Sequence, residues 1–212
     1  MENLEEKVAS NLLKIKAVFL SPNEPFTWAS GIKSPIYCDN RLTLSYPEVR
    51  KVVENGLVEV IKKYYPTCEV VMGTSTAGIA HAAYVSDILN LPMGYVRSGA
   101  KDHGRKNQIE GVTPVGKNVV VIEDLISTAG SSIEVCNILR EAGCNVLGIA
   151  SIFTYELKSG LDNLKNANVV NHSLSNFSAL IKQAVKENYI SESDLSKLEA
   201  FQKDPNSDWQ SK

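Results

Sequence analysis

The fold is decided by the stretch Val119-Val120-Val121-Ile122-Glu123-Asp124-Leu125-Ile126-Ser127-Thr128-Ala129-Gly130-Ser131-Ser132. It opens with four β-branched apolar residues, which is typical of a strand buried on both faces. Two adjacent carboxylates follow, and a run of small and hydroxylated residues then leads into a segment of helical length. The stretch therefore predicts a strand, a tight turn and a helix, the repeating unit of parallel α/β sheets.

Short apolar runs before and after this stretch repeat the pattern, each followed by small residues and a helix-length segment. The predicted strands are 69–72, 93–96, 118–123, 146–153 and 168–170, and the predicted helices between and after them are 77–89, 131–142, 175–188 and 193–202. This alternation predicts an α/β fold of Rossmann-like type, with a mainly parallel central sheet flanked by helices. Ligands of such sheets bind at the carboxyl ends of the strands.

The amino-terminal part of the chain has a different pattern. Apolar residues recur at helical spacing from Leu4 to Phe19 and from Val49 to Tyr64, which predicts two amphipathic helices. Residues 26–40 contain Gly31 and Pro35 among mixed residue types and predict a loop or short irregular strands. We therefore expect an amino-terminal region at 1–45, a core at 46–203 and a polar tail at 204–212, for which disorder is an open alternative.

The composition excludes several classes of protein. The 212 residues include 22 basic and 24 acidic side chains, so the net charge of −2 gives no support to a nucleic-acid or membrane-surface partner. The four cysteines form no CxxC pair and are expected to be reduced. No apolar run reaches the length of a membrane span, and the first residues are acidic, unlike a secretory signal. We expect a cytoplasmic protein.

The carboxylates Glu123 and Asp124 and the loop after them predict a ribose-phosphate site. Backbone N–H groups at a turn that opens a helix bind phosphate, and the hydroxyl groups of the loop add donors. Carboxylates accept hydrogen bonds from sugar hydroxyls. Two alternatives stay open: the acidic pair only begins a loop and Ser131 caps the next helix, or the pair binds a metal ion, for which two carboxylates are few ligands.

Residues 97–111 form a second candidate. They contain four Arg or Lys, one His and three Gly without an apolar period, which predicts a mobile basic loop suited to a polyanion. The alternative is a solvated run of charge.

The order of these motifs resembles the type I phosphoribosyltransferases, and within that family the orotate branch. The block at 119–132 resembles their phosphoribosyl-pyrophosphate (PRPP) motif, and Lys101-Asp102-His103-Gly104 resembles the closing loop of the orotate branch. Residues 26–39 resemble the amino-terminal hood of that branch, and 73–80 resemble the pyrophosphate loop. The resemblance covers roughly residues 20 to 180, and it implies that the region 1–45 is a helix and hood placed before a phosphoribosyltransferase core.

The resemblance also implies an activity: transfer of a phosphoribosyl group from PRPP to N1 of orotate, giving orotidine 5′-monophosphate and pyrophosphate in pyrimidine biosynthesis. Arg97, Lys101 and His103 would be catalytic and would neutralise the pyrophosphate. The family uses Mg²⁺, bound mainly through PRPP rather than at a protein metal site, and forms homodimers with shared active sites. The residues implied to bind PRPP, by the ribose hydroxyls or the 5′-phosphate, are Glu123, Asp124, Leu125, Ile126, Ser127, Thr128, Ala129, Gly130 and Ser131.

Three positions depart from the pattern. Ala29, Ala77 and Thr154 stand where some members carry two lysines and an orotate-binding arginine. The orotate carboxylate would then be held by backbone N–H groups, by a hydroxyl such as that of Ser127, or by a cation, for which Lys33 is the candidate. A phosphoribosyltransferase for another base, and a non-catalytic PRPP-sensing regulator with the same fold, remain alternatives.

Overall fold

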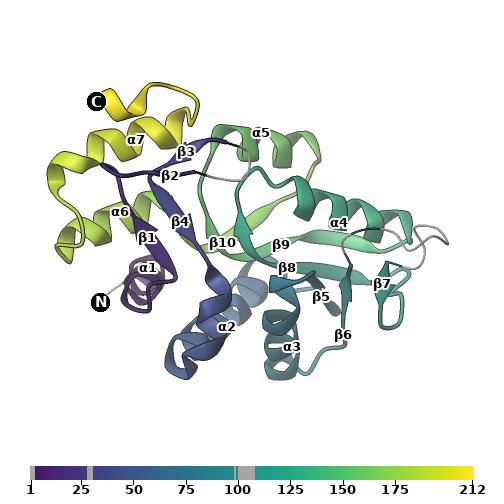
Figure 1. Cartoon of the computed structure of the whole chain (residues 1–212). Helices are drawn as coiled ribbons and strands as arrows, with labels where there is room; N and C mark the ends of the chain where they lie inside the picture. Colours follow the sequence, from purple (N-terminus) through teal and green to yellow (C-terminus); the bar gives the residue numbers. More distant parts are fainter. Residues whose placement is uncertain (1–2, 28–30, 98, 100–107) are drawn as a thin grey trace.

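The computed structural model describes residues 3–27, 31–97, 99 and 108–212, and a six-stranded sheet forms its centre (Figure 1). The strands are β5 (Val70–Thr74), β6 (Met93–Val96), β7 (Ile109–Glu110), β8 (Asn118–Ile126), β9 (Asn145–Thr154) and β10 (Asn171–Asn176). They lie in the order β10-β9-β8-β5-β6-β7, and all neighbours are parallel except β6 and β7. The predicted α/β fold with a mainly parallel sheet is confirmed.

Strand β8 lies in the middle of the sheet, hydrogen-bonded to β5 on one side and β9 on the other. Its pairing with β9 continues to Ile126, opposite Thr154, so the strand is longer than the predicted 118–123. Glu123 and Asp124 therefore lie inside a paired strand, where the ladder fixes their backbone. The apolar side chains of β8 alternate between the two main apolar clusters of the protein: Val119 and Val121 on one face, Val120 and Ile122 on the other.

Helices cover both faces of the sheet, as Figure 1 shows. One face packs against α1 (Leu4–Lys14), α2 (Pro47–Tyr64) and α3 (Ala77–Leu89), and the other packs against α4 (Gly130–Glu141) and α5 (Lys158–Asn166). Helix α6 (Phe177–Lys186) packs against α1, and α7 (Leu195–Lys203) packs against α6. No helix in the described part of the chain has the length and apolar character needed to cross a bilayer.

The hood consists of two small antiparallel pairs. Strand β1 (Val18–Leu20) pairs with β4 (Ile36–Cys38), and β2 (Phe26–Thr27) pairs with β3 (Lys33–Ser34). A 3₁₀ helix, η1 (Asn40–Ser45), then leads into α2. The hood is therefore connected directly to the core, and η1 is the segment that enters it.

Three local predictions differ from the structure. Helix α1 ends before Phe19, because Lys16 has a positive φ of 57° and Phe19 lies in β1. Helix α5 was not predicted, since its sequence is mostly polar. The last strand is 171–176 rather than 168–170, because Asn168 has a φ of 54° and turns the chain before the pairing with β9 begins.

The polar tail at 204–212 contacts the core through one side chain. Trp209 is only 2% exposed and lies edge-on to Phe201 of α7, with 5.6 Å between the ring centroids. This contact places the last turn of the chain, η4 (Trp209–Ser211), against α7. The domain boundaries remain predictions.

We predict that Gly78→Ala destabilises the protein by about 1–3 kcal/mol, the usual cost of overpacking a core. A Cβ at Gly78 would clash with the carbonyl oxygen of Ile122, so α3 would have to move away from β8. Gly130→Ala is the control, because a Cβ there meets no atom within 4 Å. Chemical denaturation of both variants measures the difference, and equal stabilities would contradict the predicted contact between α3 and β8.

Candidate functional site

A cavity of about 290 Å³ lies at the carboxyl ends of β5 and β8. Both carboxylates of the acidic pair line it, and so does the first residue of α3. Its full lining is Thr74, Ser75, Thr76, Ala77, Arg97, Glu123, Asp124, Leu125, Ser131, Glu134, Val135 and Ile138. The cavity is at the end of the sheet where ligands of parallel α/β proteins bind.

Two helices begin at this cavity, and neither has a side-chain cap. Helix α3 begins after Thr76 and α4 begins after Ala129, and neither of these N-cap residues makes a side-chain hydrogen bond to its helix. Such N–H groups carry the positive end of the helix dipole and bind anions. The cavity therefore offers two separate places for negatively charged groups.

The turn at 127–131 is held in shape from behind. Ala129 has a φ of 64°, a left-handed conformation that costs a non-glycine residue roughly 1–2 kcal/mol and persists only where neighbours fix it. Helix α5 supplies those neighbours: Asn163 donates from Nδ2 to the carbonyl oxygen of Thr128 at 3.0 Å, and Gly160 packs directly on the carbonyl of Ser127. At the front of the turn, Gly130 faces open space.

Glu123 is buried, with 6% of its surface exposed, and its carboxylate is fully hydrogen-bonded. Its Oε1 accepts from the hydroxyl of Thr74 at 2.8 Å and from the backbone N–H of Asp124 at 2.9 Å. Its Oε2 accepts from the hydroxyl of Ser132 at 2.8 Å. Glu123 thus joins β5, β8 and the first turn of α4 to one another.

Asp124 is in a different situation. Burial, and then the hydrogen bond and charge of Glu123, raise the pKa of its carboxyl to about 7, so the acidic pair holds a proton near neutral pH. Its backbone carbonyl accepts a hydrogen bond from Asn40 Nδ2 at 2.7 Å. The Asp124 carboxyl is the member of the pair that a ligand in the cavity reaches more readily, because Asp124 is half-buried whereas Glu123 is buried.

The hood meets the core beside Asp124. Tyr155 follows β9 and is 3% exposed, and it makes a hydrogen bond with the backbone of Cys38 in β4. Burial, and then the nearby Cys38 and Asp124, raise the pKa of its hydroxyl well above its ordinary value. Tyr155, the first residue after β9, therefore lies near Asp124 of the acidic pair.

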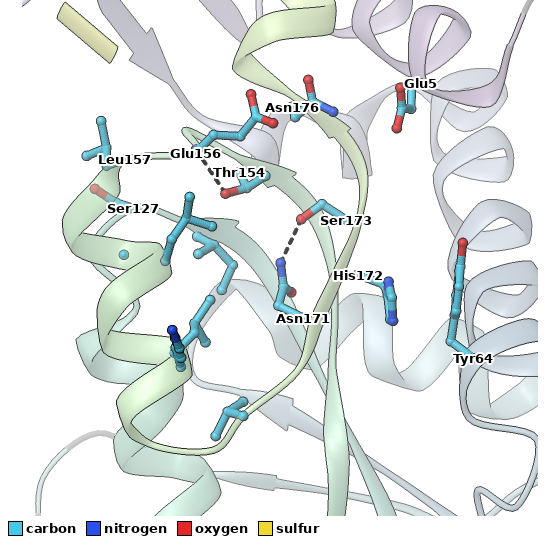
Figure 2. Close-up of a pocket in the computed structure, with 16 residues that line it drawn as sticks. Glu5, Tyr64, Ser127, Thr154, Glu156, Leu157, Asn171, His172, Ser173 and Asn176 are labelled. Carbon is cyan, nitrogen blue, oxygen red and sulfur yellow. Dashed lines mark hydrogen bonds between the residues drawn. The ribbon is translucent and has the colours of Figure 1, made fainter. Parts of the chain in front are cut away.

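A second cavity of about 480 Å³ lies between α5 and β10, behind the turn at 127–131 (Figure 2). Ser127 and Thr154 line it, but neither Glu123 nor Asp124 does. Figure 2 shows that its polar side chains bond to one another: Asn171 donates to Ser173 at 2.9 Å. Because it lacks the acidic pair, we assign the candidate reaction site to the first cavity.

The basic loop is closed at its base. The backbone N–H of Arg97 donates to the carbonyl oxygen of Gln108 at 2.9 Å, and Gln108 Nε2 donates to the carbonyl of Arg97 at 3.3 Å. The side chain of Arg97 lines the first cavity and forms an ion pair with Glu110, with 2.9 Å between Nε and Oε1. Lys101 and His103 lie outside the described residues, so their predicted roles stay predictions.

The structure separates the other predicted site residues. Lys33 is exposed in the hood and donates from Nζ to Thr27 Oγ1 at 2.7 Å, and it lines neither cavity. Ala29 lies outside the described residues. The residues predicted for PRPP fall into three groups: Glu123, Asp124, Leu125 and Ser131 line the first cavity, Ile126 and Ser127 line the second, and Thr128, Ala129 and Gly130 form the turn between them.

Sequence reasoning missed Asn40, Tyr155 and Asn163. None stands in a recognisable motif of its own, and the contacts that give each a place at the site come from distant parts of the chain. Asn40 carried a weak signal, because it lies directly after the hood segment that resembles the orotate branch.

Comparisons with known proteins agree with this geometry. A family model described as a phosphoribosyl transferase domain matches residues 45–186. A curated orotate phosphoribosyltransferase of Bacillus cereus is 59% identical over 202 residues, which is 95% of this chain and 96% of the relative.

Among solved structures, an orotate phosphoribosyltransferase from Aeropyrum pernix has a TM-score of 0.74 and 29% identity, covering 87% of this chain and 99% of that one. The UMP synthase of Leishmania donovani has a TM-score of 0.80 and 27% identity, covering 93% of this chain and 42% of that one.

The acidic pair predicts how stability depends on pH. The pKa of Asp124 rises from 3.8 to about 7 on folding, so the folded protein binds the proton more tightly and the free energy of unfolding falls as the pH rises through this range. An amide cannot ionise. Asp124→Asn should therefore melt at a higher temperature than the wild type at pH 8, with a difference that shrinks toward pH 4.

Thermal melting between pH 4 and pH 8, without ligands, measures this difference. Asp87→Asn, at an exposed position of α3, controls for the exchange of a carboxyl for an amide. A gap between Asp124→Asn and the wild type that is the same at both ends of the pH range would contradict the raised pKa.

Proposed function

The chain belongs to the orotate phosphoribosyltransferase family, and from this premise we propose how its residues transfer the phosphoribosyl group of PRPP to N1 of orotate. The products are orotidine 5′-monophosphate and pyrophosphate, and the reaction belongs to pyrimidine biosynthesis. One observation supports the assignment of the site: two uncapped helix ends and an acidic pair line a single cavity. PRPP carries two phosphate groups of different kinds on one ribose, which is the ligand chemistry that this arrangement fits.

We place PRPP by matching charge to these groups. The 5′-phosphate binds the N–H groups and hydroxyls of the turn at 127–131, at the beginning of α4. The pyrophosphate lies at the beginning of α3, where Thr74 to Ala77 line the cavity. The ribose hydroxyls then meet the acidic pair, with Asp124 as the main acceptor and Glu123 holding the Asp124 N–H group. Arg97 reaches the same cavity and can neutralise the leaving group.

The reaction needs no nucleophilic side chain, because orotate is itself an anionic nucleophile. The bond from C1′ to the pyrophosphate oxygen breaks, the bond from N1 to C1′ forms, and the bonding pair leaves with pyrophosphate. Positive charge develops on the ribose in an oxocarbenium-like transition state. The protein contributes position and charge stabilisation, the two terms that preorganised sites supply best. The carboxylate of Asp124, proposed to bind the ribose hydroxyls, is close to this positive charge.

The residues present fit a Mg²⁺ ion that is held mainly by the substrate. No group of three or more His, Cys, Asp and Glu side chains among the described residues is arranged to bind a metal. Mg²⁺ commonly keeps several waters and binds through one or two carboxylates together with substrate phosphates. Asp124 is the carboxylate that would take part, and the bound ion would neutralise pyrophosphate charge.

The base is proposed to lie between the acidic pair and the hood. Tyr155, which is hydrogen-bonded to the backbone of Cys38 in β4, lies near Asp124 on that side. Two side chains are proposed to hold the orotate carboxylate. Ser127 is the first residue of the turn at 127–131, and Lys33 lies in the hood. A cytoplasmic location stays a prediction.

The overall reaction is tested by mixing the protein, Mg²⁺, PRPP and orotate and following the ultraviolet absorbance of orotate. We expect orotate to be consumed in proportion to the PRPP added. The control is Asp124→Asn, which should consume orotate more slowly because its affinity for PRPP is reduced. Turnover with uracil or a purine but not with orotate would point to another base. Binding of PRPP without turnover of any base would point to a regulator.

We propose a homodimer in which the basic loop acts in the partner's site. The support is a face formed by η1, α2 and α3, elements that contact one another. Four large apolar side chains on this face are 37–46% exposed: Leu42, Tyr46, Tyr84 and Ile88. Exposed apolar patches of this kind are typical of association surfaces.

Mixed dimers test the shared site and the role of Lys101 together. We expect Lys101→Ala to lower kcat by orders of magnitude without changing the melting temperature, and Asp124→Asn to weaken PRPP binding. If each site combines a loop and an acidic pair from different copies, then mixing the two inactive variants restores one intact site in each mixed dimer. Activity that stays at the level of the separate variants would rule out sharing, and a wild-type rate for Lys101→Ala would rule out its role.

A further inference from the structure

Asn40 connects the hood to the acidic pair across 84 residues of sequence. It is the first residue of η1 and has no exposed surface. Its Nδ2 donates to the backbone carbonyl oxygen of Asp124 at 2.7 Å. A carbonyl oxygen can only accept, so the amide nitrogen of Asn40 must face Asp124 and the orientation of this amide is determined.

The other groups of Asn40 are held equally firmly. Its Oδ1 accepts from the thiol of Cys38 at 3.3 Å, and its backbone carbonyl accepts from the hydroxyl of Thr43 at 2.7 Å. Thr43 in turn lies 3.4 Å from the buried ring of His81 in α3. Burial and the nearby Arg50 lower the pKa of His81 to about 4, so this ring is neutral at physiological pH. Turning the Asn40 amide away from Asp124 would also break its bond from the Cys38 thiol.

The peptide groups on both sides of Asp124 are thus fixed by side chains. Glu123 Oε1 accepts from its N–H at 2.9 Å, and Asn40 donates to its carbonyl at 2.7 Å. The direction of a side chain follows from the backbone that carries it, so these two bonds set where the Asp124 carboxyl points. One bond comes from the core and the other from the hood.

We propose that Asn40 is a positioning residue for the ribose of PRPP, acting through Asp124. This inference rests on the proposed role of Asp124 as the acceptor of the ribose hydroxyls. The ligand group whose binding depends on Asn40 is the cis-diol of the ribose, not a phosphate. The hood therefore influences PRPP binding through a single buried amide, in addition to covering the base.

Two neutral substitutions remove the amide donor. Asn40→Leu keeps the branched shape of the side chain, and Asn40→Ser is the second variant if the first does not fold. We expect the Kd of PRPP and of ribose 5-phosphate to rise about tenfold, because a buried carbonyl next to the diol acceptor loses its partner. The Kd of inorganic pyrophosphate, which has no diol, should change less than about twofold. Calorimetry on the full chain with Mg²⁺ measures all three.

The matched control is Thr43→Val. This variant removes a buried hydroxyl from the same 3₁₀ helix, and with it the bond to the Asn40 carbonyl, but it leaves the Asn40 amide bond to Asp124 in place. PRPP binding should stay within about twofold of the wild type.

A double-mutant cycle shows whether Asn40 acts through Asp124. In the Asp124→Asn background, the substitutions at Asn40 should have almost no further effect on ribose 5-phosphate binding. The same loss in both backgrounds, an equal loss for pyrophosphate, or wild-type affinity in the Asn40 variants would each overturn the proposal. If Asp124→Asn itself leaves ribose 5-phosphate binding unchanged, the ribose role of Asp124 fails first, and the proposal for Asn40 fails with it.

Discussion

The carboxylate of Glu123 is the interaction on which the site depends. It accepts hydrogen bonds from Thr74 of β5 and Ser132 of α4, and from the backbone of its own strand. These elements carry the acidic pair and lead into the two turns that are proposed to bind the phosphate groups. A buried charge is stable only when such donors surround it. Because all three elements donate to the Glu123 carboxylate, this one group fixes the distances between them. The relative position of the two helix ends follows from that spacing.

The acidic pair is an unfavourable arrangement that the rest of the structure supports. Two adjacent carboxyl groups near the end of a buried strand lose hydration and also interact with each other, which is why the pKa of Asp124 is raised. The positive ends of α3 and α4 at the same cavity offset part of this repulsion. Under the proposed assignment, a ligand that brings hydroxyl donors and a cation relieves the remainder. The group that weakens the empty protein is therefore the one that a diol and its metal ion can stabilise.

The sequence was most informative where the signal was local. Strand β8 and helix α3 are formed by residues whose apolar spacing and turn chemistry are visible in short windows, and the acidic pair follows directly from them. The difference between Glu123 and Asp124 was not visible, because it depends on Thr74 and Ser132. The place of Asn40 was hidden for the same reason, since its partner is 84 residues away. Helix α5 carries few apolar residues, and its support of the turn at 127–131 depends on the packing of Gly160 against the turn.

The two edges of the sheet have a consequence for the whole molecule. Strand β10 is one edge of the sheet, and the other edge, β7, has only two residues. An exposed strand edge is a template for pairing with other chains, and apolar edges lead to aggregation. Strand β10 packs against α1, α2 and α6, and its Asn171 and Ser173 side chains bond to each other and to Ser151 of the neighbouring strand. Because every residue of β10 is buried or half-buried, packing limits pairing at that edge, and the two-residue length of β7 limits pairing at the other edge.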